Sequence, residues 1–105
     1  MIADDLRLLR LVRTLTSEVY LLWDEDQRAG QVDIHFADDI IHATIVLEAD
    51  LDEQEIRSLI KRFDREVVSS HRQDYERENF LVTVFRGSEV YLYADEGTEG
   101  PNMEW

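Results

Sequence analysis

The sequence predicts an α+β protein, a two-layer sandwich in which two helices cover one face of a five-stranded, mainly antiparallel sheet. Three observations support this class: apolar residues recur at helical spacing in two segments, they follow strand patterns in others, and turn-forming residues separate the segments. The expected element order is α-β-β-β-α-β-β. We expect a single domain over residues 1–94 and a flexible acidic tail over residues 95–105.

The first expected helix covers residues 3–15. Its apolar stripe, at helical spacing, comprises Ile2, Leu6, Leu9 and Val12. Residues 18–23 follow as a strand that is apolar at consecutive positions, which is typical of a strand covered on both faces. The polar residues 24–30 are expected to be the loop of a hairpin.

A second hairpin is expected from two strands that flank a pair of aspartates. Residues 31–36 alternate between polar and apolar, and residues 41–47 do the same. A two-residue turn at 38–39 places Phe36 opposite Ile41, so that the apolar side chains of both strands share one face.

The other face of this hairpin carries the candidate metal ligands. The same register places His35 opposite His42 and Asp33 opposite Thr44, with Cβ atoms of paired residues about 4.5–5.5 Å apart. Two imidazoles at that spacing can share one metal ion, with Asp33 as a third ligand. The alternative is that all three are ordinary polar residues of a solvated sheet face, and we expect no resident cofactor.

The second helix is expected to begin near Asp50 with a capping box, formed by Asp50 and Glu53 or by Asp52 and Glu55, and to end near Ser70 or Arg77. Its apolar stripe comprises Ile56, Leu59, Ile60, Phe63 and Val67. A last hairpin is expected from strands 80–86 and 89–94 around a Gly-Ser turn.

This last hairpin is apolar on both faces, whereas the two helices can cover only one face of the sheet. An uncovered patch rich in tyrosine and phenylalanine is typical of a protein interface. The alternatives are that the tail, with Met103 and Trp105, covers the patch or that the tyrosines stand in water. The expected partner or dimer interface comprises Tyr20, Leu22, Phe80, Val82, Val84, Tyr91 and Tyr93.

The chain is strongly acidic, with 24 acidic residues, 11 basic residues and a formal net charge of −13. So negative a chain is not expected to bind nucleic acids or anionic membranes, which require clustered lysine and arginine. The acids concentrated over residues 24–55 could instead face a basic partner or mimic a nucleic acid, or the charge could reflect adaptation to high salt. The N-terminal residues lack signal-peptide features, and we expect a cytoplasmic protein without disulfides, since cysteine is absent.

No catalytic motif is present, so we expect a non-enzymatic, homodimeric protein-binding module of the adaptor or chaperone kind. The expected element order, the small size and the acidity resemble the specialised chaperones of type III secretion systems. That resemblance covers residues 3–94 in topology only. It implies an acidic dimer that holds an extended stretch of a secreted partner, and it assigns no site residues. The competing hypotheses are a metal-binding or small enzymatic domain using His35, His42 and Asp33, and an acidic nucleic-acid mimic.

Overall fold

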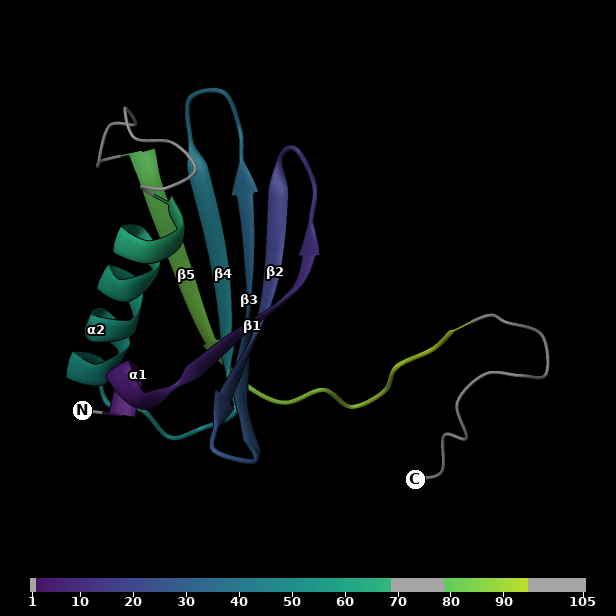
Figure 1. Cartoon of the computed structure of the whole chain (residues 1–105), viewed down its shortest axis with the longest axis vertical. Coiled ribbons are helices and arrows are strands. Elements are labelled where there is room, and N and C mark those ends of the chain that lie inside the picture. Colours follow the sequence, from purple (N-terminus) through teal and green to yellow (C-terminus); the bar gives the residue numbers. More distant parts are fainter. Residues whose placement is uncertain (1, 69–78, 95–105) are drawn as a thin grey trace.

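The computed structural model describes residues 2–68 and 79–94. Its helices and strands form one body, from which the last described residues extend (Figure 1). In chain order the elements are α1 (Ile2–Asp5), β1 (Arg7–Arg13), β2 (Ser17–Asp24), β3 (Gln27–Phe36), β4 (Ile41–Leu47), α2 (Glu53–Phe63), the π-helical turn η1 (Asp64–Val68) and β5 (Phe80–Arg86).

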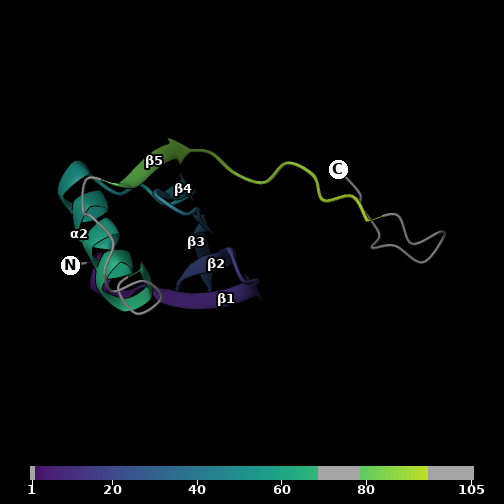
Figure 2. The same ribbon diagram turned by 90° about the horizontal axis from the view of Figure 1, so that it is seen from above.

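The five strands form one sheet in the order β1-β2-β3-β4-β5. The first four strands are an antiparallel meander, and β5 lies parallel to β4 after the α2 connection. The sheet curves around α2, which lies against its concave face (Figure 2). The α+β class and the five-stranded, mostly antiparallel sheet are therefore confirmed, whereas the order after the short α1 is β-β-β-β-α-β.

The predicted first helix over residues 3–15 is wrong for most of its length, because residues 7–13 form the edge strand β1. A polar turn reverses the chain directly after β1: the Thr14 amide donates to the Ser17 carbonyl at 2.8 Å, and the two hydroxyl groups are 2.7 Å apart. This turn pairs β1 with β2. The leucine spacing indicates only a weak local preference for a helix. Backbone pairing with β2 along the whole strand stabilises the extended conformation more.

The central hairpins follow the prediction closely. β2 matches the expected strand, and β4 pairs with β3 in the predicted register, with Phe36 opposite Ile41. β3 begins at Gln27, so the predicted loop over residues 24–30 is mostly strand. The first hairpin therefore has a much tighter connection than expected.

Helix α2 begins as predicted. Asp52 accepts a hydrogen bond from the Glu55 amide at 2.8 Å, and the Glu55 carboxylate accepts one from the Asp52 amide at 3.2 Å. Leu59 and Phe63 face the sheet, and the helical stretch continues through η1, where Val67 and Val68 are buried. The expected continuation toward residue 77 and the tail over residues 95–105 lie outside the described residues.

The predicted last hairpin is wrong, because β5 pairs with β4 in parallel and residues 89–94 pair with no described strand. The α2 connection returns the chain to the free edge of β4, where a parallel neighbour completes the sheet. Arg86 secures the end of β5 by donating hydrogen bonds to the carbonyl oxygens of Ala49 and Leu51, each at 3.1 Å.

The core lies between the concave face of the sheet and α2. It takes alternate residues from β2, β3 and β4, together with Leu6 and Leu51 from the segments that flank the sheet. The guanidinium group of Arg62 donates to the Leu6 carbonyl at 2.6 Å and so ties the start of β1 to the helix. None of the described helices is long and apolar enough to cross a membrane.

Candidate functional site

The predicted aromatic interface is largely on the covered face of the sheet. Leu22 is fully buried, and Tyr20 packs edge-on against Phe63 of α2 with ring centroids 5.4 Å apart. Three residues of β5, Phe80, Val82 and Val84, also pack against the core. The expectation that these five side chains form an uncovered patch is therefore wrong, because α2 lies against their face and not against the opposite one.

Tyr91 and Tyr93 lie elsewhere, on the segment of residues 87–94 that follows β5. This segment, named the arm, extends away from the body without pairing to a described strand (Figures 1 and 2). Tyr93 is 67% exposed, and its neighbours Val90 and Leu92 are 81% and 53% exposed. The two tyrosines thus remain candidates for an interface, but they are separated from the other five predicted residues.

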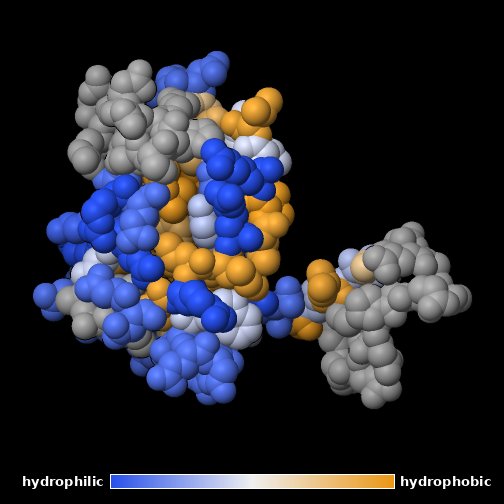
Figure 3. Space-filling view, viewed as in Figure 1, coloured by the Kyte–Doolittle hydropathy of each residue, from blue (hydrophilic) through white to orange (hydrophobic). Residues whose placement is uncertain are grey.

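Among the described strands, β1, which was predicted to be a helix, carries the most exposed large apolar side chains. Leu9, Leu11 and Val12 are 44%, 52% and 45% exposed, and we name these three residues the β1 margin. Hydrophobic side chains gather on the side of the body that carries β1, whereas the outer surface of α2 is hydrophilic (Figure 3). The signal that could have revealed this strand is the Thr-Leu-Thr-Ser turn between two apolar segments.

Three arginines are interspersed with the apolar residues of β1. Arg10 and Arg13 approach the carboxylate of Glu18 on β2, at 3.7 and 3.9 Å. Arg7 has no ion-pair partner among the described residues. Since β1 contains no acidic residue, it forms a basic and apolar edge on a protein that is acidic overall.

Glu18 is the buried charged group that holds this edge in place. This residue is 3% exposed, and its Oε1 accepts a hydrogen bond of 2.6 Å from the hydroxyl of Tyr20. Burial, followed by the hydrogen bond to Glu18, raises the pKa of Tyr20 to about 12. This cluster fixes the position of β1 against β2, because it connects the two arginines of the edge to the core.

The predicted metal ligands lie on the face of the sheet opposite α2. The register places His35 opposite His42 and Asp33 opposite Thr44, as expected. The Asp33 carboxylate accepts a hydrogen bond from the side-chain amide Nε2 of Gln31 at 3.0 Å. Within residues 2–68 and 79–94, no three histidine or carboxylate side chains come together in a way that could hold a metal ion. The structure thus brings the two histidines into register without a third ligand.

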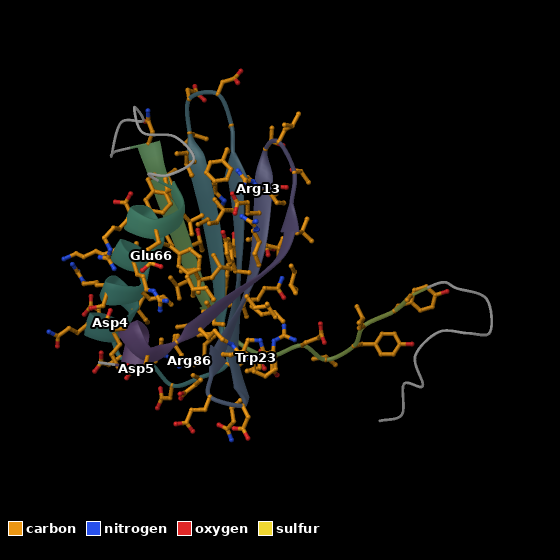
Figure 4. All side chains as sticks on the ribbon, in the orientation of Figure 1. Asp4, Asp5, Arg13, Trp23, Glu66 and Arg86 are labelled. Carbon is orange, nitrogen blue, oxygen red and sulfur yellow. The ribbon has the colours of Figure 1, made fainter. Side chains whose placement is uncertain are left out.

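A shallow hollow of about 270 Å³ lies on the same face, at the base of the arm. Ion pairs and hydrogen bonds cross it: Arg28 Nε lies 2.8 Å from a Glu48 oxygen, and Arg28 Nη2 donates to Gln31 at 3.1 Å. Trp23 and Arg86 lie at this end of the body, where the arm begins (Figure 4). Small-molecule sites usually measure about 300–1,000 Å³. This smaller hollow is lined by the mutually paired side chains of Arg28, Gln31 and Glu48, and is better described as a surface ion-pair network.

Comparison with protein-family models, characterised proteins and solved structures finds no match to this chain. The resemblance to type III secretion chaperones depended on the order α-β-β-β-α-β-β. Because the observed order is β-β-β-β-α-β, that topological resemblance no longer has a basis.

Proposed function

We propose that this chain is a non-enzymatic protein-binding module that associates with a second copy of itself through β1, in the manner of an adaptor. The observation that carries the proposal is the β1 margin. A strand at the edge of a sheet presents unpaired amide and carbonyl groups, and proteins usually protect such edges with charges, prolines or short strands. β1 has arginines, but it also exposes three large apolar side chains beside its free edge.

A protein partner fits this edge better than a small molecule does. An added strand satisfies the backbone groups of β1, and its side chains can cover Leu9, Leu11 and Val12. The arginines supply charge selectivity for an acidic partner segment. A bulge at Leu11 twists the edge locally but leaves backbone groups available on both sides of it.

The test is the molar mass in solution, measured by light scattering over a range of concentrations at low and high salt. We expect twice the chain mass of 12.4 kDa at both salt concentrations, because an apolar interface depends weakly on screening. Replacing Leu9, Leu11 and Val12 together with serine should raise the dissociation constant at least about tenfold, since apolar contacts at the centre of an interface contribute most of its free energy.

The matched control is Leu81→Ser, because Leu81 is 46% exposed on β5, at the opposite edge of the sheet. This control should leave the dimer intact, and circular dichroism should show that all variants are folded. A dimer that survives the triple substitution would refute the assignment to β1. A chain that folds only at high salt and stays monomeric would indicate that its acidity is a salt adaptation.

A further inference from the structure

The two strands at the β1 end of the sheet carry an apolar strip on the face opposite α2. Val19 and Leu21 alternate with buried residues of β2, so their side chains point away from α2. Val12 is paired with Val19 and Leu9 with Leu21, so the strip continues onto β1. Leu9 and Val12 are its outermost members, and no described strand pairs with the outer edge of β1.

The bulge at Leu11 determines how β1 presents its side chains. Arg10 and Val12 are paired with consecutive residues of β2, so Leu11 is an extra residue between them. Side chains of a regular strand change face at every position, and one extra residue reverses that alternation. Leu9 and Val12 therefore share the uncovered face although they are three positions apart.

A strand with this pattern matches an antiparallel copy of itself. A two-fold axis through the bulge, between Arg10 and Leu11, places Leu9 opposite Val12 of the second copy, and both point to the uncovered face. The same axis places Leu8 opposite Arg13, and both belong to the covered face. Side chains thus meet others of their own face on both sides of the bulge, along the whole of β1.

Other positions of the axis fit less well. An axis at Arg10 would place this arginine opposite its own copy, and like charges in direct opposition are destabilising. It would also place Leu8, which packs against the core, opposite Val12, which points to the other face. An axis at Leu9 keeps the faces in register but pairs only residues 7–11, so that Val12 lies outside the paired stretch.

The charges of β1 are compatible with the axis through the bulge. Arg10 and Arg13 keep Glu18 of their own chain at 3.7 and 3.9 Å. Because β1 contains no acid, two bodies that each carry a formal charge of −13 meet along an edge where no acid faces another. The acidic partner that the arginines select is then the body of the second copy. Each arginine lies opposite an uncharged residue of the second copy: Arg7 opposite Thr14, Arg10 opposite Leu11 and Arg13 opposite Leu8.

We propose that β1 of one copy pairs antiparallel with β1 of a second copy, about a two-fold axis that passes through the bulge. This inference rests on the proposed function, because it names the segment of the second copy that occupies the β1 margin. The two sheets join into one sheet of ten strands. The symmetry closes the assembly at two copies, whereas pairing of β1 with the β5 edge of another copy would continue without end. Two symmetric rows of four apolar side chains then cross the interface, each consisting of Leu21, Leu9, Val12 and Val19.

The first test measures the contact between Leu9 and Val12 with introduced cysteines, since the chain has none of its own. Leu9→Cys and Val12→Cys are prepared separately, mixed under reducing conditions and then gently oxidised. Opposite residues of antiparallel strands have Cα atoms about 4.5–5.5 Å apart, which a disulfide can bridge. We expect the mixture to give at least about tenfold more disulfide-linked dimer on a non-reducing gel than either variant alone.

The single variants and one further cysteine are the matched controls. Two copies of the same position lie about 10 Å apart along the strands, beyond the reach of a disulfide, so Leu9→Cys alone and Val12→Cys alone should stay unlinked. Leu81→Cys, on β5, should stay unlinked with either of them, because β5 is the opposite edge of the sheet. Circular dichroism should show that all variants are folded.

The second test follows the backbone of the unaltered protein by amide hydrogen exchange. Strand pairing protects the outer amides of β1, whereas contact between sheet faces leaves them open to water. Diluting the protein through its dissociation constant should therefore accelerate exchange over residues 8–13 at least about tenfold. Exchange over β5 should stay unchanged on dilution.

The outcomes distinguish failure of this inference from failure of the proposed function. Linkage in the mixture together with concentration-dependent protection of β1 supports the pairing about the bulge. Self-linkage of Leu9→Cys, or linkage of either variant to Leu81→Cys, refutes it in favour of a different axis or a head-to-tail contact. If the serine substitutions dissociate the dimer but β1 shows neither linkage nor protection, β1 is an interface without strand pairing. A monomer at all concentrations refutes both proposals.

Discussion

Replacing Tyr20 with phenylalanine removes one hydroxyl group from the core and leaves the aromatic ring against Phe63. The lost hydrogen bond, 2.6 Å long, ends on the carboxylate of Glu18, which is 3% exposed. Hydrogen bonds to charged groups contribute about 1.5–3 kcal/mol to stability. We therefore expect Tyr20→Phe to lower the free energy of unfolding by about 2 kcal/mol at neutral pH, and the melting temperature by roughly 10 °C.

The same hydroxyl makes the effect depend on pH in a direction that can be worked out. The folded-state pKa of Tyr20, about 12, lies above its ordinary value of 10.0, chiefly through burial and then through the hydrogen bond to Glu18. The stabilisation is therefore complete below pH 10 and is lost as the pH rises through 12. At 1.36 kcal/mol per pH unit this amounts to roughly 2–3 kcal/mol. Because phenylalanine does not titrate, the difference between wild type and variant should disappear over this interval.

The assay is urea unfolding from neutral pH to about pH 12, followed by far-UV circular dichroism because tyrosinate quenches tryptophan fluorescence. Tyr93→Phe is the matched control, since Tyr93 is 67% exposed and its variant should differ from wild type by no more than about 0.5 kcal/mol. A difference between Tyr20→Phe and wild type that persists unchanged to the highest pH would refute the reasoning. Equal stabilities at neutral pH would do so as well.

Three further predictions concern the sheet and its ends. Gly30→Ala should destabilise the protein by at least about 1–3 kcal/mol in thermal unfolding, because the added Cβ would collide with the carbonyl oxygen of Val46; a smaller loss would mean that β4 can shift. Arg86→Ala should lose about 1–2 kcal/mol, measured by urea unfolding, through its hydrogen bonds to the loop before α2; an unchanged midpoint would show that these bonds are not stabilising. Zinc titrated calorimetrically should give the same heats with wild type and with a His35→Ala, His42→Ala double variant, since within residues 2–68 and 79–94 no third ligand joins the pair; a larger wild-type heat would support the metal hypothesis.

The parts of the fold that could be predicted are those whose signals are local. The pair of aspartates at 38–39 determined the register of β3 and β4, and therefore the opposition of His35 and His42. The capping box at Asp52 and Glu55 likewise depends on residues three positions apart. In both cases, the backbone geometry follows from side chains within one turn of each other.

The parts that were missed depend on contacts between distant segments. Residues 7–13 have leucines at spacings that suit a helix, and only their pairing with β2 makes them a strand. β5 was expected to pair with the residues that follow it, but its partner β4 lies across the whole α2 connection. Which face α2 would cover depends on the hand of that crossover, which is not a local property of the sequence. Tyr20 and Leu22 were expected to be uncovered because the sequence does not show that α2 lies against their face of the sheet.

The parallel pairing of β4 with β5 has a consequence for the order in which the protein is made and folded. The first four strands are joined by short turns, so they can assemble while the chain is still being synthesised. β5 completes the sheet only after Phe80–Arg86 has been translated, and until then the edge of β4 stays open. The last strand to form is also the one that carries the arm. A partner that recognised the arm would therefore meet a body whose meander had already formed.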